Sequence, residues 1–129
     1  MIKIKNYEDA CKLLNYDPKK ILPDVSNCPE EHRKSMIAYF KLIIIIEAIN
    51  IQDNDGKKWI PDYTDGTSKY QPLFKMGSSS GVGFAYSCYD YWDTYSHSGS
   101  RLCYKNYDSM IDTVNDKEIL ALYKAKYTR

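Results

Sequence analysis

The sequence predicts an α+β fold with one long buried central helix, a small antiparallel sheet and a C-terminal helix. Three observations carry this prediction: an apolar helical pattern early in the chain, a middle part without helical signals, and a helical pattern at the end. This order of elements is typical of α+β domains. The 129 residues show no internal repeat and fit one domain, residues 1–129, with a helical part (1–50), a strand and loop part (51–106) and the C-terminal helix (107–129).

A short helix is expected first, over residues 7–14. Asn6 suits its N-cap because the side chain can accept a hydrogen bond from a free backbone N–H of the first turn. Asp17-Pro18 should end this region, since the residue before a proline avoids helical dihedral angles. Residues 18–28 are therefore expected to form a loop.

The central helix is predicted from Pro29 to Ile49. Pro29 suits the first helical position, and the two glutamates that follow favour the positive end of the helix dipole. The first third of the pattern is polar, but residues 36–49 are apolar almost all round. A helix that is apolar on most sides must be buried on most sides. It is therefore either the centre of the fold or part of a subunit interface, so a homo-oligomer through residues 36–49 stays open.

Short strands are expected in the middle part, separated by turn signals rich in Asp, Asn and Gly. The expected strands lie around residues 59–60, 70–76, 82–92 and 101–105. The final helix is expected over residues 107–127. Asn115 followed three residues later by Glu118 resembles a capping box, so this helix is predicted to break near Asn115.

Charge and hydropathy exclude several classes of partner. The formal net charge is +1, the pI is about 7.6, and each of the three parts is balanced to within one charge. A duplex-DNA binder usually carries a basic stripe, because phosphate neutralisation dominates its affinity, so duplex DNA is not expected. The start of the chain lacks the apolar core of a secretory signal, and its longest apolar run, residues 42–46, is far too short to span a bilayer. We expect a cytoplasmic protein without a membrane partner, with its four cysteines reduced.

Three patterns resemble catalytic or metal sites without completing them. The Asp53–Gly56 segment resembles a calcium loop, but Ile51 would occupy the first ligand position. The Gly77–Gly81 segment matches G-x-S-x-G, but it lacks the large parallel sheet that this motif needs. Cys28 and His32 could be half of a zinc site, but no close cysteine pair completes it. We therefore predict no catalytic residue, no metal site and no cofactor; whether the protein is an enzyme stays open, with binding favoured over catalysis.

The aromatic segment after residue 83 is the strongest functional signal. The chain has 13 tyrosines and three phenylalanines, and tyrosine suits binding surfaces because it is amphipathic and costs little entropy to hold. Regular alternation would place Phe84, Tyr86, Cys88 and Trp92 on one face of a strand and Tyr89, Tyr91 and Tyr95 on the other. In the alternative interpretation, helices cover both faces. The predicted binding residues are Tyr89, Tyr91, Tyr95 and Trp92, with Arg101 beside them.

A resemblance covers nearly the whole chain. Its most recognisable part is Gly99-Ser100-Arg101-Leu102-Cys103-Tyr104-Lys105, together with Trp59-x-Pro61-Asp62-Tyr63, Lys69-Tyr70-x-Pro72-x-Phe74 and a closing Leu122-Tyr123-Lys124. With these motifs the sequence resembles a group of small proteins of gut Bacteroidetes and their phages or prophages, for which no activity is established. The resemblance implies a phage or mobile-element context and no catalytic residues.

The sequence therefore predicts a non-catalytic accessory protein of phage or prophage type. It would bind a protein or other macromolecular partner through a surface rich in tyrosine and tryptophan. The open alternatives are a single-stranded nucleic-acid binder, in which aromatic rings stack on bases, a virion structural component, and an inhibitor of a host defence system. The expected location is the cytoplasm of the bacterial host cell or, for the virion component, the virion.

Overall fold

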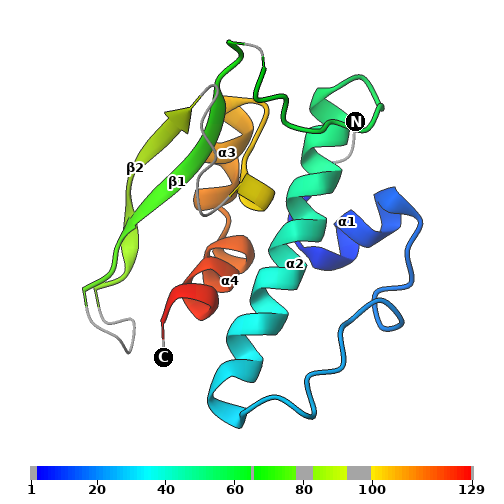
Figure 1. Ribbon diagram of the computed structural model, residues 1–129, viewed down its shortest axis with the longest axis vertical. Helices are drawn as coiled ribbons and strands as arrows, with labels where there is room; N and C mark the ends of the chain where they lie inside the picture. Colours follow the sequence, from blue (N-terminus) through cyan, green and yellow to red (C-terminus); the bar gives the residue numbers. More distant parts are fainter. Residues whose placement is uncertain (1–2, 65, 78–82, 93–99, 129) are drawn as a thin grey trace.

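The helices and the sheet are arranged in layers around one central helix (Figure 1). The computed structural model describes residues 3–64, 66–77, 83–92 and 100–128. Helix α1 packs on one side of α2, α4 packs on the other side, and a ribbon of two strands lies against α3 and α4. The predicted α+β class is confirmed. The elements are α1 (Tyr7–Leu14), α2 (Glu30–Asp53), β1 (Lys69–Lys75), β2 (Ala85–Trp92), the 3₁₀ helix η1 (Ser100–Leu102), α3 (Tyr107–Val114) and α4 (Lys117–Tyr127).

Helix α1 begins and ends as its sequence predicts. The Asn6 side chain accepts a hydrogen bond of 2.8 Å from the backbone N–H of Asp9, which caps the first turn. Asn15 ends the helix in the left-handed region with φ of 61°, a conformation that asparagine tolerates. Tyr7 is buried against α2, and its hydroxyl donates to the carbonyl of Pro18 at 2.7 Å. This bond ties the loop after α1 to the start of the helix.

Helix α2 is the central element, as predicted, and it runs four residues beyond the expected end at Ile49. Its buried residues cover several sides because α1 and α4 pack against it from different directions. By length and composition α2 could also cross a membrane, a property that it shares with core helices of compact domains. The buried residues of α2 are Ala38, Leu42, Ile44, Ile45, Ile46, Ala48, Ile49 and Asn50.

Asn50 is the polar member of this buried set, with 5% of its surface exposed. Its side-chain amide donates a hydrogen bond to the carbonyl of Cys103 at 2.9 Å, and its oxygen accepts one from the backbone N–H of Lys105 at 2.9 Å. The residue between these two, Tyr104, pairs with Tyr70 of β1 through two backbone hydrogen bonds of 3.1 and 2.8 Å. Asn50 therefore holds the backbone of residues 103–105 in place on one side, and β1 pairs with this segment on its other side.

The middle of the chain contains fewer strands than its sequence predicts. Strands β1 and β2 pair antiparallel, but residues 59–60 are irregular. The expected strand over residues 101–105 is wrong: η1 takes its first half, and only Tyr104 forms an isolated bridge. We call the two hydrogen bonds of Asn50 the Asn50 clamp, and they explain why no strand forms here. The clamp holds the backbone on both sides of Tyr104 and leaves a single residue free to pair with β1.

The C-terminal helix is broken in two, as predicted, but the cap is one residue later than expected. Asp116, not Asn115, accepts hydrogen bonds from the backbone N–H groups of Glu118 and Ile119 at 3.0 and 3.1 Å. Asn115 instead ends α3. The break turns the chain so that α3 contacts β1 while α4 contacts α2.

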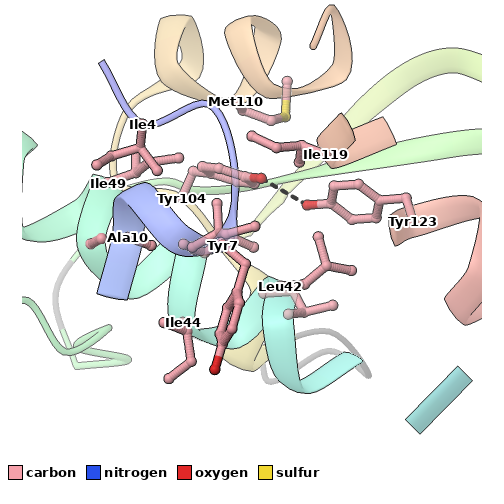
Figure 2. Close-up of a cluster of buried hydrophobic side chains, with 14 of the residues drawn as sticks. Ile4, Tyr7, Ala10, Leu42, Ile44, Ile49, Tyr104, Met110, Ile119 and Tyr123 are labelled. Atoms are coloured by element: carbon pink, nitrogen blue, oxygen red, sulfur yellow. Dashed lines mark hydrogen bonds between the residues drawn. The ribbon is translucent and has the colours of Figure 1, made fainter. Parts of the chain in front are cut away.

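A directed chain of hydroxyl groups runs through the core, and Figure 2 shows its link between Tyr104 and Tyr123. The Thr113 hydroxyl donates its single proton to the carbonyl of Met110 at 2.7 Å. Tyr104, 2.9 Å away, must therefore donate to Thr113, and Tyr123 must donate to Tyr104 across 2.8 Å. All three side chains are buried. Burial raises the pKa of Tyr104 to about 12 and raises the pKa of Tyr123 well above its ordinary value.

Asn50→Ala should lower the free energy of unfolding by about 2–4 kcal/mol, because two buried hydrogen bonds are lost where water cannot replace them. Urea denaturation followed by circular dichroism measures this loss. Asn27→Ala, an exposed asparagine in the loop before α2, is the matched control and should change stability by less than about 0.5 kcal/mol. Equal stability of the two variants would contradict the clamp.

Stability should fall as the pH rises above about 10. The unfolded chain loses its tyrosine protons near pH 10, whereas the pKa of Tyr104 in the folded chain is about 12. The stabilisation is therefore complete below pH 10 and is lost between the two values, up to about 3 kcal/mol for this one side chain.

Tyr104→Phe isolates this effect. The variant should be less stable at pH 7 by about 1–3 kcal/mol, since the donor to Thr113 and the acceptor for Tyr123 disappear, but its stability should fall less steeply between pH 10 and 12. Tyr16→Phe, at a tyrosine that is 42% exposed, is the control. If Tyr104→Phe keeps the alkaline slope of the wild type, the buried phenol does not set that slope.

Candidate functional site

Of the five predicted binding residues, three have exposed side chains, and the side chains of the other two are not described by the structure. Tyr89 and Tyr91 of β2 are 40% and 59% exposed. Arg101 is also exposed, in η1. Trp92 is the last residue of β2, and only its backbone is described. Tyr95 lies outside the described residues.

A β-bulge decides which side chains share a face with these tyrosines. Residues directly opposite each other in an antiparallel pair lie on the same face. Tyr91 is opposite Tyr70, Tyr89 is opposite Pro72, and Tyr86 is opposite Phe74. The six residues of these three pairs therefore lie on one face of the ribbon. The prediction that Tyr86 lies on the face opposite Tyr89 and Tyr91 is wrong.

The cause of this error is one extra residue in β2. Tyr86 pairs with Phe74 and Cys88 pairs with Leu73, so Ser87 between them has no partner across the ladder. An unpaired residue of this kind shifts the alternation of side chains by one position and adds local twist. The opposite face of the ribbon carries Leu73, which is 41% exposed, and Cys88, which is also exposed.

The tyrosine face is covered at one end and open at the other. At the covered end the ring of Phe74 lies 4.9 Å from that of Tyr123 and 6.0 Å from that of Tyr127, both in α4. At the open end Tyr89 and Tyr91 of β2 are 40% and 59% exposed, and Tyr107 at the start of α3 is 39% exposed. The interpretation in which helices cover both faces of the strand is therefore wrong for this end.

Four tyrosines at the open end form the tyrosine cluster, defined here as Tyr70, Tyr89, Tyr91 and Tyr107. The ring centroids of Tyr89 and Tyr107 are 4.7 Å apart, and those of Tyr70 lie 5.9 Å from Tyr107 and 6.0 Å from Tyr89. Tyr91 extends the cluster, with its ring 6.3 Å from that of Tyr89. The two contacts of Tyr107 have the edge-to-face geometry that aromatic rings prefer, with angles of 62° and 64°, and the other two pairs are tilted at 35° and 54°. The cluster is therefore preorganised, since its rings hold one another in place.

Among the described residues, the outer edge of β2 beside the tyrosine cluster pairs with no other strand. Tyr70 directs its N–H and C=O to Tyr104, so Tyr91, opposite Tyr70, directs its own away from β1. By the same alternation Tyr89 points its backbone groups outward, and Pro72 opposite it occupies a position where no N–H is needed. The N–H of Tyr91 donates to the Asp90 carboxylate at 2.9 Å. A capped donor of this kind protects an edge strand from pairing with other chains.

Tyr89 and Tyr91 of the tyrosine cluster are among the binding residues predicted from the sequence. Tyr107 belongs to the same tyrosine-rich stretch of the sequence but is not among those predicted residues. Tyr70 was assigned to a different strand. Its contact with Tyr89 depends on the register and on the bulge, and neither is visible in the alternation of residue types.

The other patterns singled out in the sequence do not assemble into a reactive site within the described residues. There, no three His, Cys, Asp or Glu side chains lie close enough to hold a metal ion. Asp55 and Gly56, with φ of 56° and 80°, form a left-handed turn that ends α2. Residues 78–81 of the G-x-S-x-G pattern lie outside the described residues. The four cysteines, all described, form no disulfide, and burial raises the pKa of the Cys103 thiol to about 11, which keeps it protonated and a poor nucleophile.

A cavity of about 230 Å³ lies between α2 and α3. It is lined by Asp53, Ser109 and Asp112, among others, but the Ser109 hydroxyl donates to Asp53 at 2.5 Å. No histidine or lysine within the described residues stands beside this pair, apart from Lys3 at the rim. The pair therefore links two helices, and its acceptor is a carboxylate, a weaker base than the imidazole or amine that activates a serine nucleophile.

Comparison of the chain with protein-family models, curated proteins and solved structures finds no match. The phage-type context suggested by the sequence therefore stays a prediction. The tyrosine cluster remains the feature of the described residues that most resembles a binding site.

Thiol labelling tests whether the bulge places Cys88 on the face of the ribbon opposite Tyr86. Cys88, on the outward face opposite the tyrosine cluster, should react with a disulfide reagent such as DTNB within seconds to minutes in the folded protein. Cys11 and Cys103 are buried and should react only on unfolding. Cys88→Ser should remove the fast phase, and Cys28→Ser serves as its control. A folded protein in which Cys88 is protected would contradict the register.

Proposed function

We propose that the protein is a non-catalytic accessory protein of phage or prophage type that binds a partner protein through the tyrosine cluster. One observation carries this proposal: Tyr89 and the two tyrosines that contact it, Tyr91 and Tyr107, leave about 40–60% of their surfaces exposed. Contiguous exposed aromatic surface of this kind is typical of interaction sites. Tyrosine buries a large area on binding and still supplies a hydroxyl for a hydrogen bond.

The surroundings of the tyrosine cluster favour a protein over a single-stranded nucleic acid. The exposed Asp108 follows Tyr107. Its carboxylate opposes the approach of phosphates, which supply much of the affinity of nucleic-acid binders. The tilted rings also present edges to their neighbours instead of the parallel faces on which successive bases stack.

A virion contact or the inhibition of a host defence protein would both be forms of this binding activity. We do not propose a subunit contact through residues 36–49, because α1 and α4 of the same chain already bury most apolar residues of that segment. The expected location is the cytoplasm of the bacterial host.

The double variant Tyr89→Ala/Tyr91→Ala tests this proposal. Aromatic residues at the centre of an interface often contribute 2 kcal/mol or more each, so the variant should bind its partner about 100-fold to 1000-fold more weakly. The tagged wild type and the variant are compared in pull-downs from cells of gut Bacteroidetes, uninfected and phage-infected. Both proteins should show the same circular dichroism spectrum, since neither ring is in the buried core.

Tyr16→Ala is the matched control, because Tyr16 is a similarly exposed tyrosine (42%) beyond the end of α1. It should retain every partner of the wild type. Recovery of the same partners with the wild type and with Tyr89→Ala/Tyr91→Ala would show that the tyrosine cluster is not the binding surface.

A further inference from the structure

A groove runs between the first turns of α2 and the last turns of α4, on elements that do not contribute to the tyrosine cluster. Its main hollow has a volume of about 500 Å³. An adjoining hollow of about 430 Å³ shares Lys34, Ala121 and Ala125 with it. The two hollows therefore form one continuous depression along the seam between the helices, which we call the α2/α4 groove.

The floor of the α2/α4 groove is aliphatic. Ile37 of α2 and Leu122 of α4 line it and are only partly buried. Ala121 and Ala125 stand four residues apart on one side of α4, and their small side chains leave the space open. An apolar depression of this size on a folded chain is suited to the side chains of a partner.

The rim of the α2/α4 groove is positively charged. Arg33, Lys34 and Lys41 line the main hollow and Lys124 lines the adjoining one, whereas Glu31 is the acidic residue of the two sets. The whole chain carries a net charge of only +1. The groove therefore concentrates positive charge that the composition of the chain hides.

Within the described residues, none of these cations is paired with a carboxylate. Arg33 donates to the backbone carbonyls of Cys28 and Ser26 at 2.8 and 2.9 Å, which fixes the guanidinium without a carboxylate partner. Lys41 lies 5.3 Å from the ring centre of Tyr7. Glu31, the one acidic side chain of the groove, lies 3.4 Å from the imidazole of its neighbour His32.

We propose that the α2/α4 groove binds an acidic amphipathic helix of a partner protein. The apolar side chains of that helix would fill the aliphatic floor, and its carboxylates would meet Arg33, Lys34 and Lys41 at the rim. Helices bind to grooves between helices through apolar residues three and four positions apart, and charge complementarity at the rim selects the partner and raises the association rate. A single-stranded nucleic acid fits the charge but not the floor, which offers no aromatic ring for a base.

A defined peptide serves as the probe. It has 16 residues, with leucines spaced three and four positions apart, glutamates at the other positions and a fluorescein label. Fluorescence anisotropy should give a dissociation constant between about 1 and 100 μM, and raising NaCl from 50 to 500 mM should weaken binding several-fold, because the charges at the rim are exposed to solvent. Amide shifts in NMR spectra should change along residues 33–41 and 121–125.

Two kinds of variant separate the floor from the rim. Lys34→Glu/Lys41→Glu should weaken binding of the peptide at least tenfold, whereas the matched reversal Lys19→Glu/Lys20→Glu, in the exposed loop before α2, should change it less than twofold. Ala121→Leu fills the floor without a change in charge. Because Ala121 is exposed, this variant should fold normally and lose at least tenfold in affinity.

Three results would overturn the proposal: equal binding of a peptide with lysine in place of glutamate, equal binding after the leucines are scrambled, or unchanged binding by Lys34→Glu/Lys41→Glu. Concentration-dependent dimerisation that Ala121→Leu abolishes would make a second copy of this chain the occupant and would also overturn it. Tyr89→Ala/Tyr91→Ala should bind the peptide like the wild type. The two proposals can therefore fail independently.

Discussion

The position of the sheet depends on the two hydrogen bonds that Asn50 makes to the backbone on either side of Tyr104. In this way an amide side chain at the end of the central helix does what a neighbouring strand would do. Tyr104 can then pair with β1 on its other side and direct its ring into the core. Because β1 carries β2, and β2 carries Tyr89 and Tyr91, the clamp at Asn50 also determines where the tyrosine cluster lies relative to α3.

Tyrosine serves two different purposes in this chain, and the hydroxyl group distinguishes them. In the core, Tyr123 and Tyr104 pass hydrogen bonds in one direction to Thr113, so each buried hydroxyl has a partner and burial is tolerated. In the tyrosine cluster the rings touch one another while their exposed surfaces stay available. The same residue type therefore stabilises the core through its polar atom and forms a surface through its ring.

Local features of the fold could be predicted from the sequence, whereas features that depend on pairing could not. The Asn6 cap, the apolar pattern of α2 and the break between α3 and α4 are set by residues within a few positions of one another. The partners of Asn50 are more than 50 residues away in sequence, and nothing beside Asn50 marks it as a clamp. For the same reason Tyr89 and Tyr91 could be named as surface residues, but Tyr70 could be added only once the register across the bulge was known.

The extra residue in β2 also affects the shape of the ribbon. A regular pair of strands twists evenly, but one face of this ribbon must follow two consecutive helices, α4 at the Phe74 end and α3 at the Tyr70 end (Figure 1). The bulge at Ser87 supplies additional twist between those two contacts. A chain that lacked Ser87 would keep every paired side chain of β2 on its present face but would have a straighter ribbon. Removing Ser87 would therefore weaken the packing of the ribbon against α3 and α4 and would leave the side chains on its surface unchanged.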